Sequence, residues 1–121
     1  MEANEYQDKC RLYYESPREL GPYSTILSMM SSVAEVSEIL KECLDKKHGD
    51  ISDMEQLKIN VSIGDCLFQL TNLAADVGLS LNNVMMTNIR KHQLINDRII
   101  ADELAKNSTN RNTTKNIEDD I

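Results

Sequence analysis

The sequence predicts an all-α fold, and two observations carry that prediction. The chain of 121 residues is 40% hydrophobic, yet it contains only four glycines, two prolines, one phenylalanine and no tryptophan. A composition so poor in strand-forming and turn residues disfavours an all-β sandwich or barrel. Apolar residues instead recur at helical spacing over long stretches, which short Gly- or Pro-containing segments separate. The length suits a single domain that buries its own core.

The first two expected helices are bounded by proline and glycine. The first spans residues 3–15 and ends at Ser16-Pro17, because the residue before a proline is driven out of the helical region. The second spans residues 25–47, with Ser24 as its N-cap and residues 48–50 as its break. Two lysines in its last turn suit the negative end of the helix dipole.

The next two expected helices have equally clear start signals. Residues 52–55 have the S-x-x-E form of a capping box, so the third helix begins there and runs to Val77, with Gly78 as a left-handed stop. Ser80 caps a fourth helix over residues 81–105. The predicted domain therefore covers residues 1–105. Residues 106–121, rich in Asn, Thr, Ser and Asp, are predicted to form a polar, disordered tail.

Charge and cysteine usage narrow the class of protein. The formal net charge is −7 and the isoelectric point is about 4.7, which argues against binding nucleic acid or an anionic membrane surface. The three cysteines are isolated and form no C-x-x-C pair, as is typical of a reducing compartment. No apolar run approaches the length of a membrane span, and the acidic start is unlike a signal peptide. We therefore expect a cytoplasmic protein.

Acidic side chains gather on particular helix faces. Glu35, Glu38 and Glu42 lie opposite the apolar arc of the second helix, where like charges at this spacing repel unless a cation offsets them. On the third helix, Asp65 belongs to a narrow polar strip between two apolar flanks. Facing carboxylates at Glu35, Glu38 and Asp65 predict an oxygen-rich Mg²⁺ site. The alternative is a solvated outer face, which is common on amphipathic helices.

Five short motifs follow one another between residues 32 and 91. They are EVSE at 35–38, GDCLF at 64–68, NLA at 72–74, GLSL at 78–81 and NIRK at 88–91. In this order and spacing they resemble the signature of the MazG-like, all-α nucleoside triphosphate pyrophosphohydrolases. The opening residues 5–7 are similar to a common lead-in of that family.

The resemblance implies a MazG-like helical bundle of four to five helices, completed by homo-oligomerisation to a homodimer or homotetramer. It also implies a nucleoside triphosphate substrate, hydrolysed to the monophosphate and pyrophosphate with Mg²⁺, or with Mn²⁺ in its place. The carboxylates of Glu35, Glu38 and Asp65 become metal ligands and catalytic residues in such a site. Lys91 and Asn88 become phosphate contacts, and Lys41 is a further candidate.

One position departs from the family pattern. Ser62 stands three residues before Asp65, where the family has its third acid. Glu55 is ten residues from Asp65 and does not replace that acid. Fewer negative ligands weaken cation binding, so activity is in question. The alternatives are a catalytically weakened relative that keeps the bundle for nucleotide binding or assembly, and a purely structural helical oligomer.

Few aromatic rings are available to stack on a nucleobase. Tyr6, Tyr13 and Tyr14 belong to the first expected helix, and any of them is a candidate. Phe68 lies on an apolar flank of the third helix, so core packing is its expected role.

Overall fold

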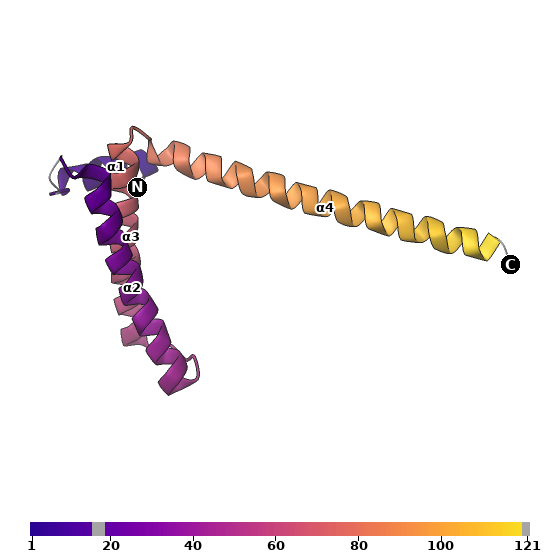
Figure 1. Ribbon diagram of the computed structural model, residues 1–121, viewed down its shortest axis with the longest axis horizontal. Coiled ribbons are helices and arrows are strands. Elements are labelled where there is room, and N and C mark those ends of the chain that lie inside the picture. Colours follow the sequence, from indigo (N-terminus) through magenta and orange to yellow (C-terminus); the bar gives the residue numbers. More distant parts are fainter. Residues whose placement is uncertain (16–18, 120–121) are drawn as a thin grey trace. The chain divides into compact units, whose positions relative to one another are not determined.

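The computed structural model describes the backbone of residues 1–15 and 19–119, and side chains as far as residue 110. Every regular element in these ranges is an α-helix (Figure 1). The helices are α1 (Ala3–Leu12), α2 (Gly21–Lys47), α3 (Asp53–Asp76) and α4 (Leu81–Asp119). The predicted all-α class is confirmed. The chain divides into two units, Met1–Val84 with α1, α2 and α3, and Met85–Ile121 with most of α4.

Helices α2 and α3 form an antiparallel hairpin, the main packed pair of the first unit (Figure 1). On α3, Thr71, Asn72 and Ala74 are buried outside the stripe that faces α2. The side chains of the two facing stripes are buried or partly exposed and recur three or four residues apart, a spacing that keeps one stripe of each helix against the other. On α2 they are Thr25, Met29, Ser32, Val36, Ile39 and Cys43, and on α3 they are Glu55, Ile59, Ser62, Cys66, Gln69 and Leu73. We call these two stripes together the seam.

The hairpin turn forms as its residues predict. His48 ends α2 in the left-handed conformation with a φ of 55°, and Gly49 follows with a φ of 90°. Ser52 then caps α3 in a complete capping box, in which its hydroxyl accepts a hydrogen bond from the Glu55 backbone N–H. The Ser52 N–H donates to Glu55 Oε1 at 3.1 Å. The predicted start of α3 is confirmed.

At the other end of the hairpin, α1 packs against α3 and holds the turn that leads into α4. The buried Gln7 carboxamide donates to the Leu79 carbonyl and accepts from the Leu81 N–H, both at 2.9 Å. Asn4 Oδ1 accepts from the Asn82 N–H at 3.2 Å. Gly78 has the predicted left-handed conformation, with a φ of 80°. The α1 side chains therefore hold the turn at residues 79–82 within the first unit.

Two boundaries near the start of the chain differ from those expected. Helix α1 ends at Leu12 instead of residue 15, since the Tyr14 N–H donates to the Arg11 carbonyl, three residues back, and the four-residue helical pattern stops with the Tyr13–Lys9 bond. The predicted stop at Ser16-Pro17 lies outside the described residues. Helix α2 begins at Gly21, not after Ser24, with its proline in the first turn. A proline fits there because the first helical N–H groups have no partner within the helix.

The structure continues α4 to Asp119, whereas the sequence predicts a disordered tail from residue 106. No glycine or proline occurs after Gly78, so nothing in the chain forces a break. The polar composition of residues 106–119 predicts little burial, but it does not prevent a helical backbone. In the part of the chain that the structure describes, no helix combines the length and hydropathy needed to cross a bilayer.

Candidate functional site

The sequence-predicted carboxylates lie midway along the α2–α3 hairpin. Cys43 Sγ donates to Glu55 Oε2 at 2.8 Å, which sets these two residues level in the antiparallel pair. Eight residues further into each helix, Glu35 is level with Ile63. Asp65 is then within one helical turn of the height of Glu35. Both carboxylate side chains are exposed.

Glu35 and Asp65 also share one flank of the hairpin. Around α2, Glu35 lies about 100° to one side of Val36, a seam residue, whereas Val33 lies about 60° to the other. Around α3, Asp65 and Ile63 lie on opposite sides of Ser62 by the same periodicity. Since Val33 and Ile63 line one pocket together, they mark one flank, and Glu35 and Asp65 belong to the other. We call this other flank the acidic flank.

Glu38 is further round α2 than Glu35 and is exposed on the outer side of the hairpin. Among residues whose side chains are described, no group of three or more His, Cys, Asp or Glu is arranged to hold a metal ion. The fold thus brings Glu35 and Asp65 to one flank. Glu38 lies about one turn beyond Glu35 on α2 and points further toward the outer side of the hairpin.

Ser62 lies in the seam, where only 3% of the residue is accessible to solvent. Counted from the Cys43–Glu55 pair, it is level with Val36. The position at which the resembled family carries an acid is therefore packed between the two helices in this chain. A longer, charged side chain there has to displace the packing or reach the acidic flank.

The candidate phosphate contacts come from two parts of the molecule. Lys41 is exposed on α2, three residues beyond Glu38. Asn88 and Lys91 are exposed on α4, three residues apart and hence on neighbouring positions of one face. They belong to the unit Met85–Ile121, whereas the carboxylates belong to Met1–Val84.

A pocket of about 330 Å³ lies where the residues that follow α1 meet α2 and α3. Its lining combines aromatic rings with hydroxyl, amide and carboxylate groups. The lining residues are Tyr13, Tyr14, Glu15, Ser24, Thr25, Ser28, Phe68 and Gln69. Two of the three candidate tyrosines thus meet Phe68 in one pocket, which we call the aromatic pocket. Tyr6 lies elsewhere on α1, where burial and a hydrogen bond with Cys10 raise its pKa to about 12.

The aromatic pocket is close to the two carboxylates. Gln69 follows Asp65 by four residues on α3, and Ser28 precedes Glu35 by seven residues on α2. These offsets return to the same side of a helix and correspond to rises of about 6 and 10 Å. The pocket and the carboxylates therefore share the acidic flank, one to two turns apart.

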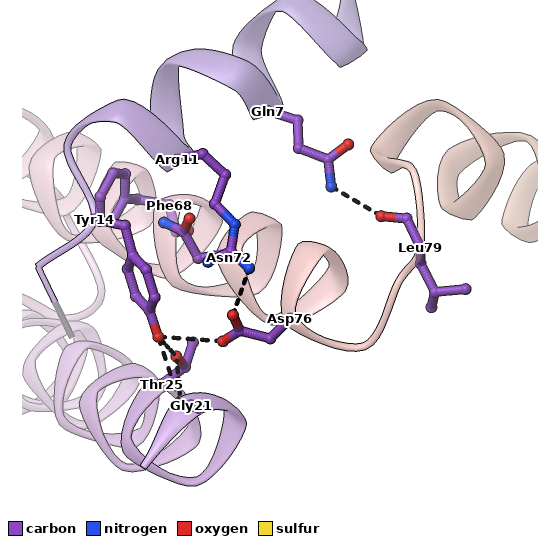
Figure 2. A network of polar contacts seen from close by, with 9 residues as sticks. All are labelled: Gln7, Arg11, Tyr14, Gly21, Thr25, Phe68, Asn72, Asp76 and Leu79. Atoms are coloured by element: carbon purple, nitrogen blue, oxygen red, sulfur yellow. Dashed lines mark hydrogen bonds and ion pairs between the residues drawn. The ribbon is translucent and has the colours of Figure 1, made fainter. Parts of the chain in front are cut away.

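A polar network that the motifs do not reveal holds Tyr14 in this pocket (Figure 2). The Tyr14 hydroxyl is 2.5 Å from Thr25 Oγ1 and donates to Asp76 Oδ2 at 3.2 Å. Arg11 donates to Asp76 Oδ1 at 2.5 Å, and its guanidinium carbon is 5.1 Å from the centre of the Tyr14 ring. Asp76 is visible in the sequence as the last member of a polar strip, but its partners come from other helices.

One fully buried amide lies beside this network. Asn72, from the NLA motif, donates from Nδ2 to the Phe68 carbonyl at 3.1 Å. Its Oδ1 is buried and accepts no hydrogen bond from the described residues. Figure 2 shows the Asn72 side chain on α3, one turn before Asp76.

The flank opposite the carboxylates is apolar and hollow. A groove of about 460 Å³ is lined by Val33, Val36, Ser37, Leu40, Ile63 and Cys66. Leu40 and Ile63 are 43% and 57% exposed, respectively. Monomeric proteins seldom leave such surface uncovered, so this apolar groove is a candidate interface.

Glu55 lies at the hairpin tip and does not belong to the Glu35–Asp65 pair, because hydrogen bonds within the tip occupy its carboxylate. Its side chain accepts from Cys43, Lys47 and Ser52. These hydrogen bonds, that of Cys43 first, hold the pKa of Glu55 well below its usual value. Glu55 in turn raises the pKa of the Cys43 thiol and of the Lys47 ammonium group.

Comparisons with family models, with curated proteins and with solved structures return no match to this chain. The function of this chain is therefore inferred from its own residues and from the motifs at 35–38, 64–68, 72–74, 78–81 and 88–91.

Proposed function

We propose that the chain is a MazG-like nucleoside triphosphate pyrophosphohydrolase, which converts an NTP or dNTP to the monophosphate and pyrophosphate. One observation carries this proposal. The Glu35–Asp65 pair and the aromatic pocket share the acidic flank, one to two helical turns apart. That spacing is of the size that separates the phosphates of a nucleotide from its base.

The donor set suits a hard divalent cation. Mg²⁺ prefers carboxylate oxygens and keeps several water ligands, so a site of few carboxylates on an exposed flank is chemically suitable. In this proposal Glu35, Glu38 and Asp65 hold the cation, with Mn²⁺ as an alternative. A cation bound there neutralises phosphate charge and lowers the pKa of a coordinated water.

The chain's other residues bind and orient the substrate. By the resemblance, Lys91 would supply a compact positive charge for the phosphates, and Asn88 an amide donor. Lys41 adds a second charge from α2. The rings of Tyr13, Tyr14 and Phe68 give the aromatic pocket planar apolar surface, which stacks on any base.

We further propose that the active form is a homo-oligomer. The apolar groove lies on the flank away from the carboxylates, so a second copy can cover it while the acidic flank stays open. The exposed apolar side chains of α3 around the groove, which include Leu67 and Leu70, would extend this contact.

The buried position of Ser62 favours a second candidate, a catalytically weakened relative. With a serine in the seam, the carboxylate set lacks one charge, and Mg²⁺ binding is weaker. Such a protein would bind nucleotide, or assemble, with little or no turnover.

Pyrophosphate release from a panel of NTPs and dNTPs, with Mg²⁺ or Mn²⁺, tests the proposal. We expect turnover by the native chain and a fall of about a hundredfold or more in kcat/KM for Asp65→Asn, because the metal supplies several kcal/mol of transition-state stabilisation. Asp45→Asn is the matched control. Asp45 is exposed on α2 and lies about 180° from Val36, away from the seam.

The same assay separates the two candidates. Absence of turnover by the native chain with both metals, together with a gain of turnover by Ser62→Glu, would establish the weakened relative. Ser62→Ala reports whether the seam tolerates substitution, since it removes a hydroxyl and adds no volume. If neither metal nor any nucleotide raises the Tm of the native chain, the pyrophosphohydrolase and the nucleotide-binding form of the weakened relative are both wrong.

A further inference from the structure

The network around Tyr14 is a chain of hydrogen bonds that ends on a carboxylate. Thr25 Oγ1 lies 2.5 Å from the Tyr14 hydroxyl, which donates to Asp76 at 3.2 Å. The Arg11 guanidinium donates to the other oxygen of the same carboxylate. The Thr25 hydroxyl itself donates to the Gly21 carbonyl at 3.2 Å, so the Tyr14 hydroxyl contacts both α2 and α3. Hydrogen bonds that end on an anion are the stronger kind.

This network fixes the Tyr14 ring at two places. The hydroxyl is held between Thr25 and Asp76, on α2 and α3, while the Arg11 guanidinium from α1 stacks over the ring. The Asp76 side chain is only 12% exposed. Water therefore competes little for it, so the ring orientation is maintained without a ligand.

Asp76 acts on the aromatic pocket from outside. Tyr14 and Thr25 are among the residues that line the pocket, whereas Asp76 and Arg11 are not. Asp76 is also eleven residues, about 16 Å along α3, from Asp65. It is too far away to join the carboxylate pair, and the proposed reaction gives it no role.

We propose that Asp76 is a positioning residue that holds Tyr14 ready to bind the base of the substrate nucleotide. The inference rests on the proposed function and deepens it, since it assigns base recognition to the aromatic pocket. A ring that is already fixed loses less conformational freedom on binding, so more of the stacking energy appears as affinity. Asp76 then contributes to binding of the base and not to binding of the phosphates.

Two conservative substitutions test this role. Tyr14→Phe keeps the ring but removes the hydroxyl contacts with Thr25, Asp76 and Gly21, and Asp76→Asn keeps the volume but removes the charge. We expect each to raise the Kd for dNTPs about threefold to tenfold, the usual effect of one hydrogen bond. The double variant should lose less affinity than the two single losses added together, because Asp76 acts in part through that hydroxyl.

A probe without a base separates positioning from general destabilisation. Calorimetry with Mg²⁺ and inorganic tripolyphosphate measures the phosphate part of binding alone. We expect its Kd to stay within twofold of the native value in both variants. Where turnover is measured, KM for dNTPs should rise while kcat changes little. Tyr23→Phe is the matched control, because Tyr23 is 78% exposed and does not line the pocket.

Distinct results would overturn this inference and the proposed function. Unchanged Kd values for dNTPs in Tyr14→Phe and Asp76→Asn, or equal losses for dNTPs and tripolyphosphate, would show that the network only stabilises the fold. The proposed function would survive that result. If the native chain binds neither dNTPs nor tripolyphosphate with Mg²⁺, the proposed function fails and this inference fails with it.

Discussion

At the scale of single residues, Glu55 shows how one carboxylate can join three segments. It receives hydrogen bonds from Cys43 and Lys47 at the end of α2, and from Ser52 at the start of α3. The donors favour the charged form, which is why the pKa of Glu55 is lowered. The same residue caps a helix and closes the hairpin.

The lowered pKa of Glu55 has a defined effect on stability. Because the unfolded side chain titrates near 4.5, the contribution is complete above that pH and is lost as the pH falls toward the folded pKa. Glu55→Gln should lower Tm by a few degrees at pH 7, and its Tm should fall less than that of the native chain on acidification. Thermal unfolding between pH 3 and 7 measures both effects.

Asp45→Asn serves as the comparison for this prediction, since Asp45 is exposed on the outer side of α2. Its Tm at pH 7 should stay close to that of the native chain. If the curves of Tm against pH are parallel for the native chain and Glu55→Gln, the hydrogen bonds of Glu55 do not contribute to stability.

At the scale of elements, local chemistry in the sequence predicts the boundaries that depend on it. The capping box at residues 52–55 and the glycine after α3 are confirmed, because each is a backbone requirement that only certain residues meet. The early start of α2 was missed. Pro22 is compatible with both an irregular link and a first helical turn, and neighbouring helices decide between them.

Gly64, within α3, and Gly78, just after its end, are a matched pair for testing these backbone requirements. A Cβ added at Gly78 or Gly64 meets no atom within 4 Å, so packing does not decide either outcome. Gly78 has a φ of 80°, and Gly78→Ala should cost about 1 kcal/mol. Gly64 lies within α3, and Gly64→Ala should add about 0.5–1 kcal/mol. Urea unfolding curves measure both free energies.

If the two substitutions change the free energy of unfolding in the same direction, the backbone explanation is wrong. The sign of each effect is the test, because both replace hydrogen by the same methyl group.

The candidate site is predictable only in part, because short motifs identify residues on one helix and not the contacts between helices. The motifs name Glu35, Glu38 and Asp65, since short patterns identify residue types at helical spacing. They do not reveal that Arg11, Tyr14 and Asp76 meet, because this network joins residues more than 60 positions apart. They also do not show that Ser62 is buried, which depends on which stripe of α3 faces α2.

At the scale of the whole molecule, the hairpin offers more apolar surface than one copy covers. The seam contains polar residues such as Thr25, Ser32 and Ser62, while Leu40, Ile63 and Leu70 remain exposed beside it. Burial of these side chains against a second copy would stabilise the fold by about 25 cal/mol for each Å² removed from water. Its stability should therefore depend on protein concentration.

Leu40→Glu should disrupt such an assembly, because it places a charge in the apolar groove. We expect a smaller particle in light scattering and a Tm that no longer rises with protein concentration. Leu27→Glu is the control, as Leu27 is 68% exposed and lies about 180° from Val36. A native chain that is monomeric at all concentrations would contradict the proposed oligomer.

Because Cys43 is buried at the hairpin tip, its rate of alkylation reports how often the tip opens. Only 1% of the residue is exposed, and its raised pKa keeps the thiol protonated, whereas the reactive form is the thiolate. Iodoacetamide should therefore modify Cys66, which is partly exposed, well before Cys43. The rate at Cys43 then measures how often α2 and α3 separate at the tip, long before the rest of the chain unfolds.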